Sequence, residues 1–164
     1  MKFYLFFLLF GIVCQSHAST DEFVARVARV VDGNTFEIVG PEDEMEILVL
    51  AGIDCPDLGQ PFAGLATRTL EKLILDKELK VLLQGRNRWG QGIAIVTIVS
   101  NGVDPRIEIL SKGLAWTSEK DPVAALETIR RQAEQEGKGL WKDQAPTPPW
   151  IYRRQQSMMQ PKSS

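Results

Sequence analysis

Apolar and polar residues alternate from residue 23 onward, and this period of two predicts a β-strand over residues 23–31 that is buried on one face. Residues 32–34 (Asp-Gly-Asn) follow, and we expect them to reverse the chain because Gly and Asn tolerate the positive φ angles of tight turns. Residues 35–39 predict the return strand. Residues 45–53 then predict a third strand, whose end is apolar on both faces.

The spacing of apolar positions changes after residue 60. Between Pro61 and Leu75 apolar residues recur every three or four positions, which predicts an amphipathic helix entered through a proline. The remaining patterns predict two strands and then two helices, at residues 79–83, 93–100, 105–114 and 122–137. We expect Gly113 to end the first of these two helices in a left-handed C-cap. This order of elements predicts an α+β fold, a five-stranded OB-type Greek-key β-barrel with three helices.

The first residues of the chain have the layout of a secretory signal peptide. Lys2 precedes an apolar run of 11 residues at 3–13, and residues 16–18 (Ser-His-Ala) carry the small side chains of a cleavage site. The run is shorter than the roughly 20 residues of a membrane-spanning helix. We therefore predict a signal peptide over residues 1–18, an exported protein (secreted or periplasmic) and no stable membrane anchor after cleavage. An uncleaved anchor and lipidation of Cys14 are the alternatives.

Cleavage after residue 18 would remove Cys14 and the only histidine, His17. The predicted mature chain then has one thiol, Cys55, and no imidazole, which excludes disulfides within it and histidine-based metal sites or bases. We expect Cys55 to be a shielded bystander, because acidic neighbours raise the pKa of a thiol. Loss of Lys2 lowers the 19 basic residues to 18, against 21 acidic residues, and the net charge becomes −3. Such a chain has little general affinity for polyanions.

Six sequence blocks follow one another along the chain: VARVVDGNTF, LVLAGIDCPD, GRNRWGQGIAIV, EILSKGLAW, EGKGLWKD and PPWIYRR. Together they resemble the staphylococcal nuclease (thermonuclease-like) family, from Val24 to about Arg154. The resemblance implies an OB-fold domain over residues 19–143. A Pro/Gln/Ser-rich C-terminal tail follows at 144–164, which we expect to be ordered only as far as residue 154. In active members the family implies calcium-dependent cleavage of DNA and RNA phosphodiesters.

Phosphodiester hydrolysis needs a hard divalent cation, a carboxylate that orients or deprotonates water, and guanidinium groups that meet the charge on the phosphate. The resemblance places the metal ligands at Asn34, Asp54 and the backbone carbonyl of Cys55, with Asp32 nearby. Asn34 stands where active members carry a carboxylate. The resemblance therefore implies a Ca²⁺ site that is weakened by one charge.

The resemblance also locates the rest of the catalytic machinery. It places the general base at Asp57, where active members have Glu, and a carboxylate displaced by about one bond can cost around a hundredfold in rate. The two phosphate-clamping arginines of active members are replaced by Val49 and Gln91, and each such loss typically costs about 10²–10³ in rate. We therefore expect an inactive or severely impaired enzyme. Compensation by Arg88 or Arg106 is the alternative.

The tryptophans divide into two groups. Trp89 lies in a predicted turn, after Arg86 and Arg88 and before a glycine. An exposed aromatic ring among cations is typical of a platform on which a nucleic-acid base stacks. We expect Trp116 and Trp141 to be core residues that pack between helices.

Three hypotheses for the function remain. The first is a monomeric module that binds single-stranded nucleic acid or a protein partner near Trp89, and it is the one we prefer. The second is a weak Ca²⁺-dependent nuclease that uses the residual acidic site. The third is a purely structural or interaction domain. The retained Asp54 and Asp57 favour the second hypothesis, and the acidic balance of the chain weighs against the first.

Overall fold

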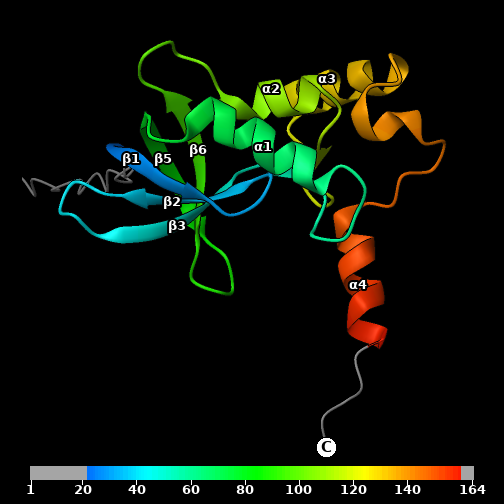
Figure 1. Cartoon of the computed structure of the whole chain (residues 1–164), viewed down its shortest axis with the longest axis horizontal. Coiled ribbons are helices and arrows are strands. Elements are labelled where there is room, and N and C mark those ends of the chain that lie inside the picture. The colour runs from blue at the N-terminus through cyan, green and yellow to red at the C-terminus, as the bar shows by residue number, and fades with distance from the viewer. Residues whose placement is uncertain (1–21, 160–164) are drawn as a thin grey trace, which may run out of the picture.

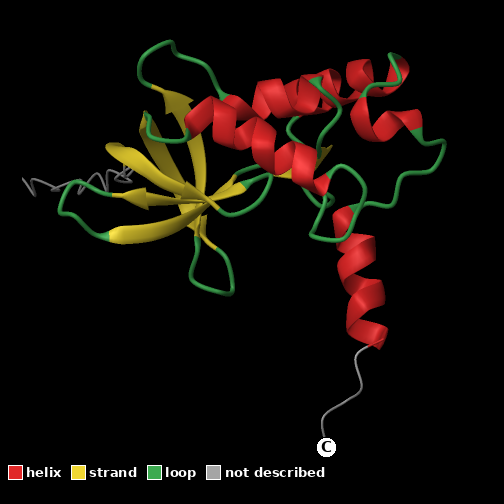
Figure 2. Cartoon of the chain, viewed as in Figure 1, coloured by secondary structure: helices red, strands yellow, loops and turns green. Residues whose placement is uncertain are grey.

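The computed structural model describes residues 22–159 and shows a β-barrel beside a layer of helices (Figure 1, Figure 2). The barrel is closed in the order β1-β2-β3-β6-β5. Its strands are β1 (Glu22–Val30), β2 (Thr35–Val39), β3 (Met45–Leu50), β5 (Glu78–Arg86) and β6 (Gly92–Ile98). The β3–β6 pair is parallel and every other neighbouring pair is antiparallel. The predicted α+β fold with a five-stranded OB-type barrel is confirmed. The predicted signal peptide lies outside the described residues.

The predicted third strand is divided in two. Its barrel portion, β3, ends at Leu50, because the chain turns at Ala51 and at Gly52, whose φ of 79° favours glycine. The next two residues form β4 (Ile53–Asp54), which pairs with β7 (Trp116–Thr117) in a separate two-stranded sheet. Asp54 therefore belongs to this small sheet and not to the barrel.

Three helices form the layer beside the barrel in Figure 1: α1 (Ala63–Ile74), α2 (Pro105–Ser111) and α3 (Ala124–Gln135). All three match predicted helices. The chain leaves α2 through Gly113, whose φ is 67° and whose added Cβ would lie 2.2 Å from the carbonyl oxygen of Lys138. The expected left-handed glycine is thus confirmed, and only glycine fits there.

The structure has a fourth helix that the sequence analysis did not predict. After the 3₁₀ turn η1 (Gly139–Lys142), the chain forms α4 (Pro149–Met159), which projects from the helical layer in Figure 2. We expected order only as far as residue 154, and the helix continues five residues further. Proline at its first position is favourable, because the missing N–H would have no partner within the helix.

The core fills the barrel and the space beneath α1. Alternate residues of β6, Ala94, Val96 and Ile98, are buried, as a strand with one face on the core requires. Leu70 and Ile74 of α1 are fully buried, four residues apart on the same helix face. Within residues 22–159 no helix is both long and apolar enough to cross a bilayer.

A cluster of three tryptophans joins α4 to this frame. Trp116 is 6% exposed, and its ring meets those of Trp141 and Trp150 edge to face, with centroid separations of 5.4 Å and 6.5 Å. The predicted packing role of Trp116 and Trp141 is confirmed. Trp150 extends the cluster into the first turn of α4.

Candidate functional site

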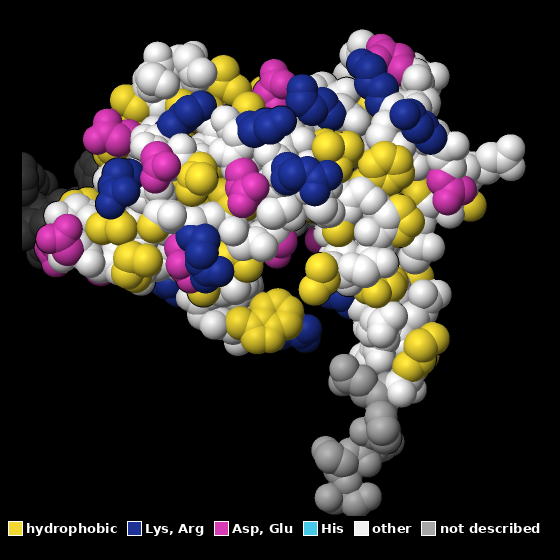
Figure 3. Space-filling model, in the orientation of Figure 1, with side chains coloured by type: hydrophobic (Ala, Val, Ile, Leu, Met, Phe, Trp, Pro, Cys, Tyr) yellow, Lys and Arg dark blue, Asp and Glu magenta, His cyan; other side chains and the backbone are white. Residues whose placement is uncertain are grey.

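A cleft of about 500 Å³ lies between the end of the barrel, the β5–β6 loop (residues 87–91) and α4. Figure 3 shows the opening between that loop and α4. Seven predicted site residues line the cleft: Asp32, Asn34, Val49, Asp54, Asp57, Trp89 and Gln91. The fold therefore brings together residues from three separate blocks of the sequence.

The turn at residues 32–34 is built around side-chain hydrogen bonds. Asp32 Oδ1 accepts the backbone N–H of Asn34 at 2.9 Å, and Asn34 Oδ1 accepts the backbone N–H of Cys55 at 3.1 Å. The expected positive φ at this turn is wrong. Gly33 is needed instead for close approach, because an added Cβ would lie 2.7 Å from the Cβ atoms of both Ala66 and Cys55.

Asp54 and Asp57 share a cation that the protein itself supplies. Arg153, in α4, donates to both Asp54 oxygens, from Nη1 to Oδ1 at 3.2 Å and from Nη2 to Oδ2 at 2.6 Å. The same Nη1 lies 3.0 Å from each oxygen of Asp57. Burial raises the pKa of both carboxyl groups, and the contacts with Arg153 oppose that rise. The pair of carboxylates and the guanidinium thus form one ionic cluster.

The resident groups do not fit a Ca²⁺ ion as they are arranged. Ca²⁺ takes six to eight oxygen ligands. The carboxylate of Asp54 is held by Arg153, and the amide oxygen of Asn34 already accepts a hydrogen bond from Cys55. Among residues 22–159 no three His, Cys, Asp or Glu side chains are grouped closely enough to hold a metal ion. A positive guanidinium also stands beside the carboxylates that an ion would need.

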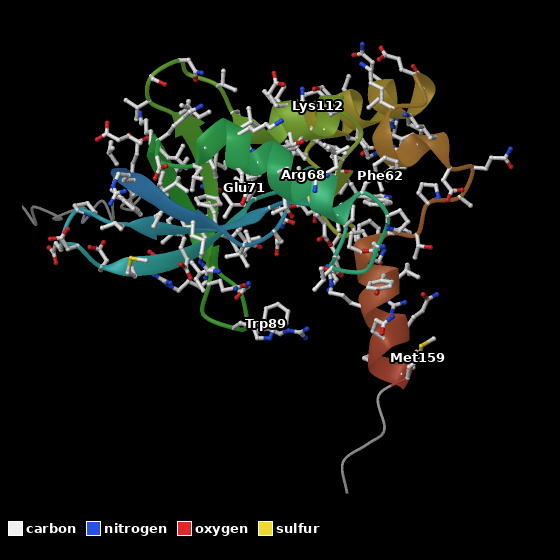
Figure 4. The ribbon with its side chains drawn as sticks, viewed as in Figure 1. Phe62, Arg68, Glu71, Trp89, Lys112 and Met159 are labelled. Carbon is white, nitrogen blue, oxygen red and sulfur yellow. The ribbon has the colours of Figure 1, made fainter. Side chains whose placement is uncertain are left out.

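The β5–β6 loop presents Trp89 at its tip, pointing away from the barrel on the side of the molecule where α4 extends (Figure 4). Its ring is 66% exposed, and the guanidinium carbon of Arg88 lies 4.1 Å from the ring centroid. Asn87 supports the loop, because its Oδ1 accepts the backbone N–H groups of Trp89 and Gln91. Arg86, predicted to belong to the same surface, instead pairs with Glu46 at 2.6 Å.

Cys55 lies beneath the turn and outside the lining of the cleft. Its side chain is buried, and burial raises the pKa of the thiol well above its usual range, with Asp32 and Asp54 adding to the effect. The expectation of an inert thiol with a raised pKa agrees with this environment.

Comparison with known proteins identifies the protein family to which the chain belongs. Residues 47–143 match the family described as staphylococcal nuclease homologue. The chain belongs to this family. It is 33% identical over 131 residues to an uncharacterized endonuclease of Escherichia coli. The matched residues cover 78% of this chain and 83% of that protein. An uncharacterized endonuclease of Haemophilus influenzae is 27% identical over 160 residues, covering 96% and 88%. The micrococcal nuclease of Shigella flexneri is 26% identical over 143 residues, covering 81% and 82%.

Two positions at which the family resemblance implies arginine carry no charge in this cleft. Val49 is half-buried on β3, paired with Thr35 and Ile93 across the sheet. Gln91 is half-buried, and its Oε1 accepts a hydrogen bond from Asn87 at 2.8 Å. Neither side chain carries a charge that could pair with a phosphate.

The two arginines considered as replacements do not line the cleft. Arg106 is 8% exposed and is held by Asp104 at 2.6 Å and by the backbone oxygen of Ala51 at 3.0 Å. Arg88 lies over Trp89 at the loop tip. Among the described residues, the basic side chains that do line the cleft are Lys120 and Arg153.

The role of Arg153 was not predicted, because the residue falls in the segment that we expected to be a tail. A usable signal was present in the PPWIYRR block. Trp150 and Arg153 are three residues apart, so in a helix begun by proline they share a face.

Proposed function

We propose that this staphylococcal nuclease homologue binds single-stranded nucleic acid in the cleft and is inactive or severely impaired as a nuclease. The ion pair of Arg153 with Asp54 and Asp57 is the observation that supports this most strongly. It engages both carboxylates that hydrolysis would use, while Val49 and Gln91 offer no charge to the phosphate. We further propose that the protein acts after export, as residues 1–18 predict.

Binding would rest on stacking more than on charge. Trp89 offers an exposed ring at the rim of the cleft, and base–aromatic stacking contributes about 1–3 kcal/mol per base in other proteins. Two exposed cations could contact phosphates. Arg88 lies over the ring of Trp89, and Lys120 lines the cleft. With two phosphate contacts, the logarithm of the affinity should fall with the logarithm of salt concentration with a slope of about −1.4.

The first experiment separates binding from cleavage. The protein, produced from its full-length sequence, is mixed with heat-denatured DNA and with a short fluorescent oligonucleotide, each with millimolar Ca²⁺ or with a chelator. We expect no cleavage above that of the Asp54→Ala variant and a rise in anisotropy of the oligonucleotide. Trp89→Ala should lower the affinity about tenfold or more. Lys142→Ala, an exposed change at the end of η1 that is not part of the cleft lining, serves as the matched control.

A weak Ca²⁺-dependent nuclease is the second candidate. It is favoured by one observation, that Asp54 and Asp57 both survive at the family's acidic positions and both line the cleft. Ca²⁺-dependent cleavage that Asp54→Ala abolishes would establish this candidate in place of the first. An absence of both cleavage and oligonucleotide binding would leave the third hypothesis, a domain that serves a protein partner or a structural role.

A further inference from the structure

We propose that Arg153 is the resident cation of this cleft and that α4 is an autoinhibitory strap, which holds the guanidinium between Asp54 and Asp57 and so excludes a divalent metal ion. This inference goes beyond the proposed function and does not depend on nucleic-acid binding. It accounts for the fact that both acidic residues which the cleft keeps from its family are paired with a cation of the protein itself.

The contacts of Arg153 are those of a substitute cation. The guanidinium contacts all four oxygens of the two carboxylates at 2.6–3.2 Å, and it grips Asp54 with two nitrogens in a fork. Removing it would leave two partly buried carboxylates facing each other without compensation, which is unfavourable. A divalent ion would relieve that repulsion, so the guanidinium and the ion compete for the same oxygens.

Two further contacts fix the position of the strap. Trp150, on the same face of α4 one turn before Arg153, packs against the buried ring of Trp116. Gln60 is buried and connects both sides: its Oε1 accepts the backbone N–H of Asp57 at 2.9 Å, and its Nε2 donates to the backbone oxygen of Thr147 at 2.8 Å. The loop that carries Asp57 and the segment that leads into α4 are therefore held together directly.

The loop that carries Asp57 also has the backbone shape that contact with α4 requires. Gly59 has a φ of 96°, and an added Cβ there would lie 2.7 Å from the hydroxyl oxygen of Tyr152 in α4. Glycine thus lets the loop turn and lets Tyr152 approach. The match between loop and helix extends beyond the ion pair.

The strap is nevertheless able to open. Pro149 is the one buried residue of α4, and the helix has 11 residues, a length at which an isolated helix is marginal in water. Its position therefore depends on Trp150, Gln60 and Arg153 rather than on a wide apolar interface. We expect α4 to detach in a local opening that leaves the barrel folded.

The test measures metal binding directly, with Ca²⁺ followed by calorimetry and Tb³⁺ by luminescence sensitised by tryptophan. We expect Arg153→Gln to bind either ion about tenfold or more tightly than the unaltered protein, because one positive charge in contact with both carboxylates is lost. Arg154→Gln removes the same charge from the neighbouring exposed position and should bind like the unaltered protein. Adding Asp54→Asn to Arg153→Gln should abolish the gain.

A second variant tests the strap without changing the ionic cluster. Trp150→Ala removes the anchor on Trp116 and should raise metal affinity in the same direction, even if Arg153→Gln fails to fold. Circular dichroism checks that the barrel is intact in each variant. Equal metal affinity in the unaltered protein, Arg153→Gln and Trp150→Ala would overturn the proposal. Oligonucleotide binding through Trp89 is measured on the same samples, so a failure of this proposal is distinguishable from a failure of the proposed function.

Discussion

Glu127 holds α3 against the small sheet that carries Asp54, and its neutralisation tests how that support depends on charge. Its carboxylate accepts the Thr117 hydroxyl at 2.6 Å and three guanidinium N–H groups, from Arg130 at 2.9 and 2.8 Å and from Arg131 at 2.9 Å. The side chain is 20% exposed. The hydrogen bonds from Arg130 are the main cause that lowers the pKa of Glu127 from 4.5 to about 2.

The sign and size of the effect follow from linkage. A carboxyl group with a lowered pKa in the folded state stabilises the fold above its unfolded pKa, and this contribution is lost as the pH falls through 4.5 toward 2. The shift corresponds to about 3 kcal/mol at pH 7, of which about 1.4 kcal/mol is lost by pH 3.5. Glu127→Gln keeps the size of the side chain and removes the charge. We therefore expect it to lower the free energy of unfolding by about 2–3 kcal/mol at pH 7.

The assay is urea unfolding of both proteins at several pH values between 7 and 3.5, at one salt concentration. The difference between them should shrink as the pH falls, while the titration of Asp54 and Asp57 affects both proteins alike. Glu134→Gln is the control, because Glu134 contacts the same Arg130 but is 50% exposed, and it should change stability by less than about 1 kcal/mol. A difference between Glu127→Gln and the unaltered protein that stays constant with pH would refute the reasoning.

Three more predictions concern the turn, the thiol and the lost clamp. Gly33→Ala should lower the free energy of unfolding by about 1–3 kcal/mol in urea titrations, because its Cβ would lie 2.7 Å from those of Ala66 and Cys55; unchanged stability would contradict the close approach. The thiol of Cys55 should react with a disulfide reagent at the rate of unfolding, and fast labelling of the folded protein would contradict its burial. Arginines introduced together at Val49 and Gln91 in the Arg153→Gln variant, whose carboxylates are free to bind Ca²⁺, should raise its rate of DNA cleavage at least about a hundredfold; no gain over Arg153→Gln alone would contradict the assignment of these positions.

The barrel and its helices were predictable because they are encoded locally. Buried positions alternate along β6 and recur every three or four residues along α1, so period alone located both elements. The end of the third strand was predicted less well. An apolar run gives no sign that Gly52 turns the chain, and β4 and β7 have two residues each, too few for any period to show.

The sequence predicted which residues make up the candidate site, but not the side chains that they contact within the protein. The sequence blocks placed Asp54, Asp57 and Asn34 together, but they did not show that each already has a partner within the protein. The partner of the two carboxylates lies beyond a Pro-rich segment, and the direction in which that segment leads the chain depends on contacts such as Gln60 with Thr147. Gly33 was correctly placed in the turn, but its reason is steric and involves Ala66, which no local pattern relates to it.

The contact between α4 and the carboxylates also bears on how fast the molecule folds and unfolds. Arg153 is separated by 99 residues from Asp54 and by 96 from Asp57, so forming this contact closes a very long loop. If such a contact forms after the folding transition state, a substitution there leaves the folding rate nearly unchanged and accelerates the step in which the contact breaks. We therefore expect α4 to dock after the barrel is built, so that this contact sets the lifetime of the docked helix rather than the speed at which the barrel forms.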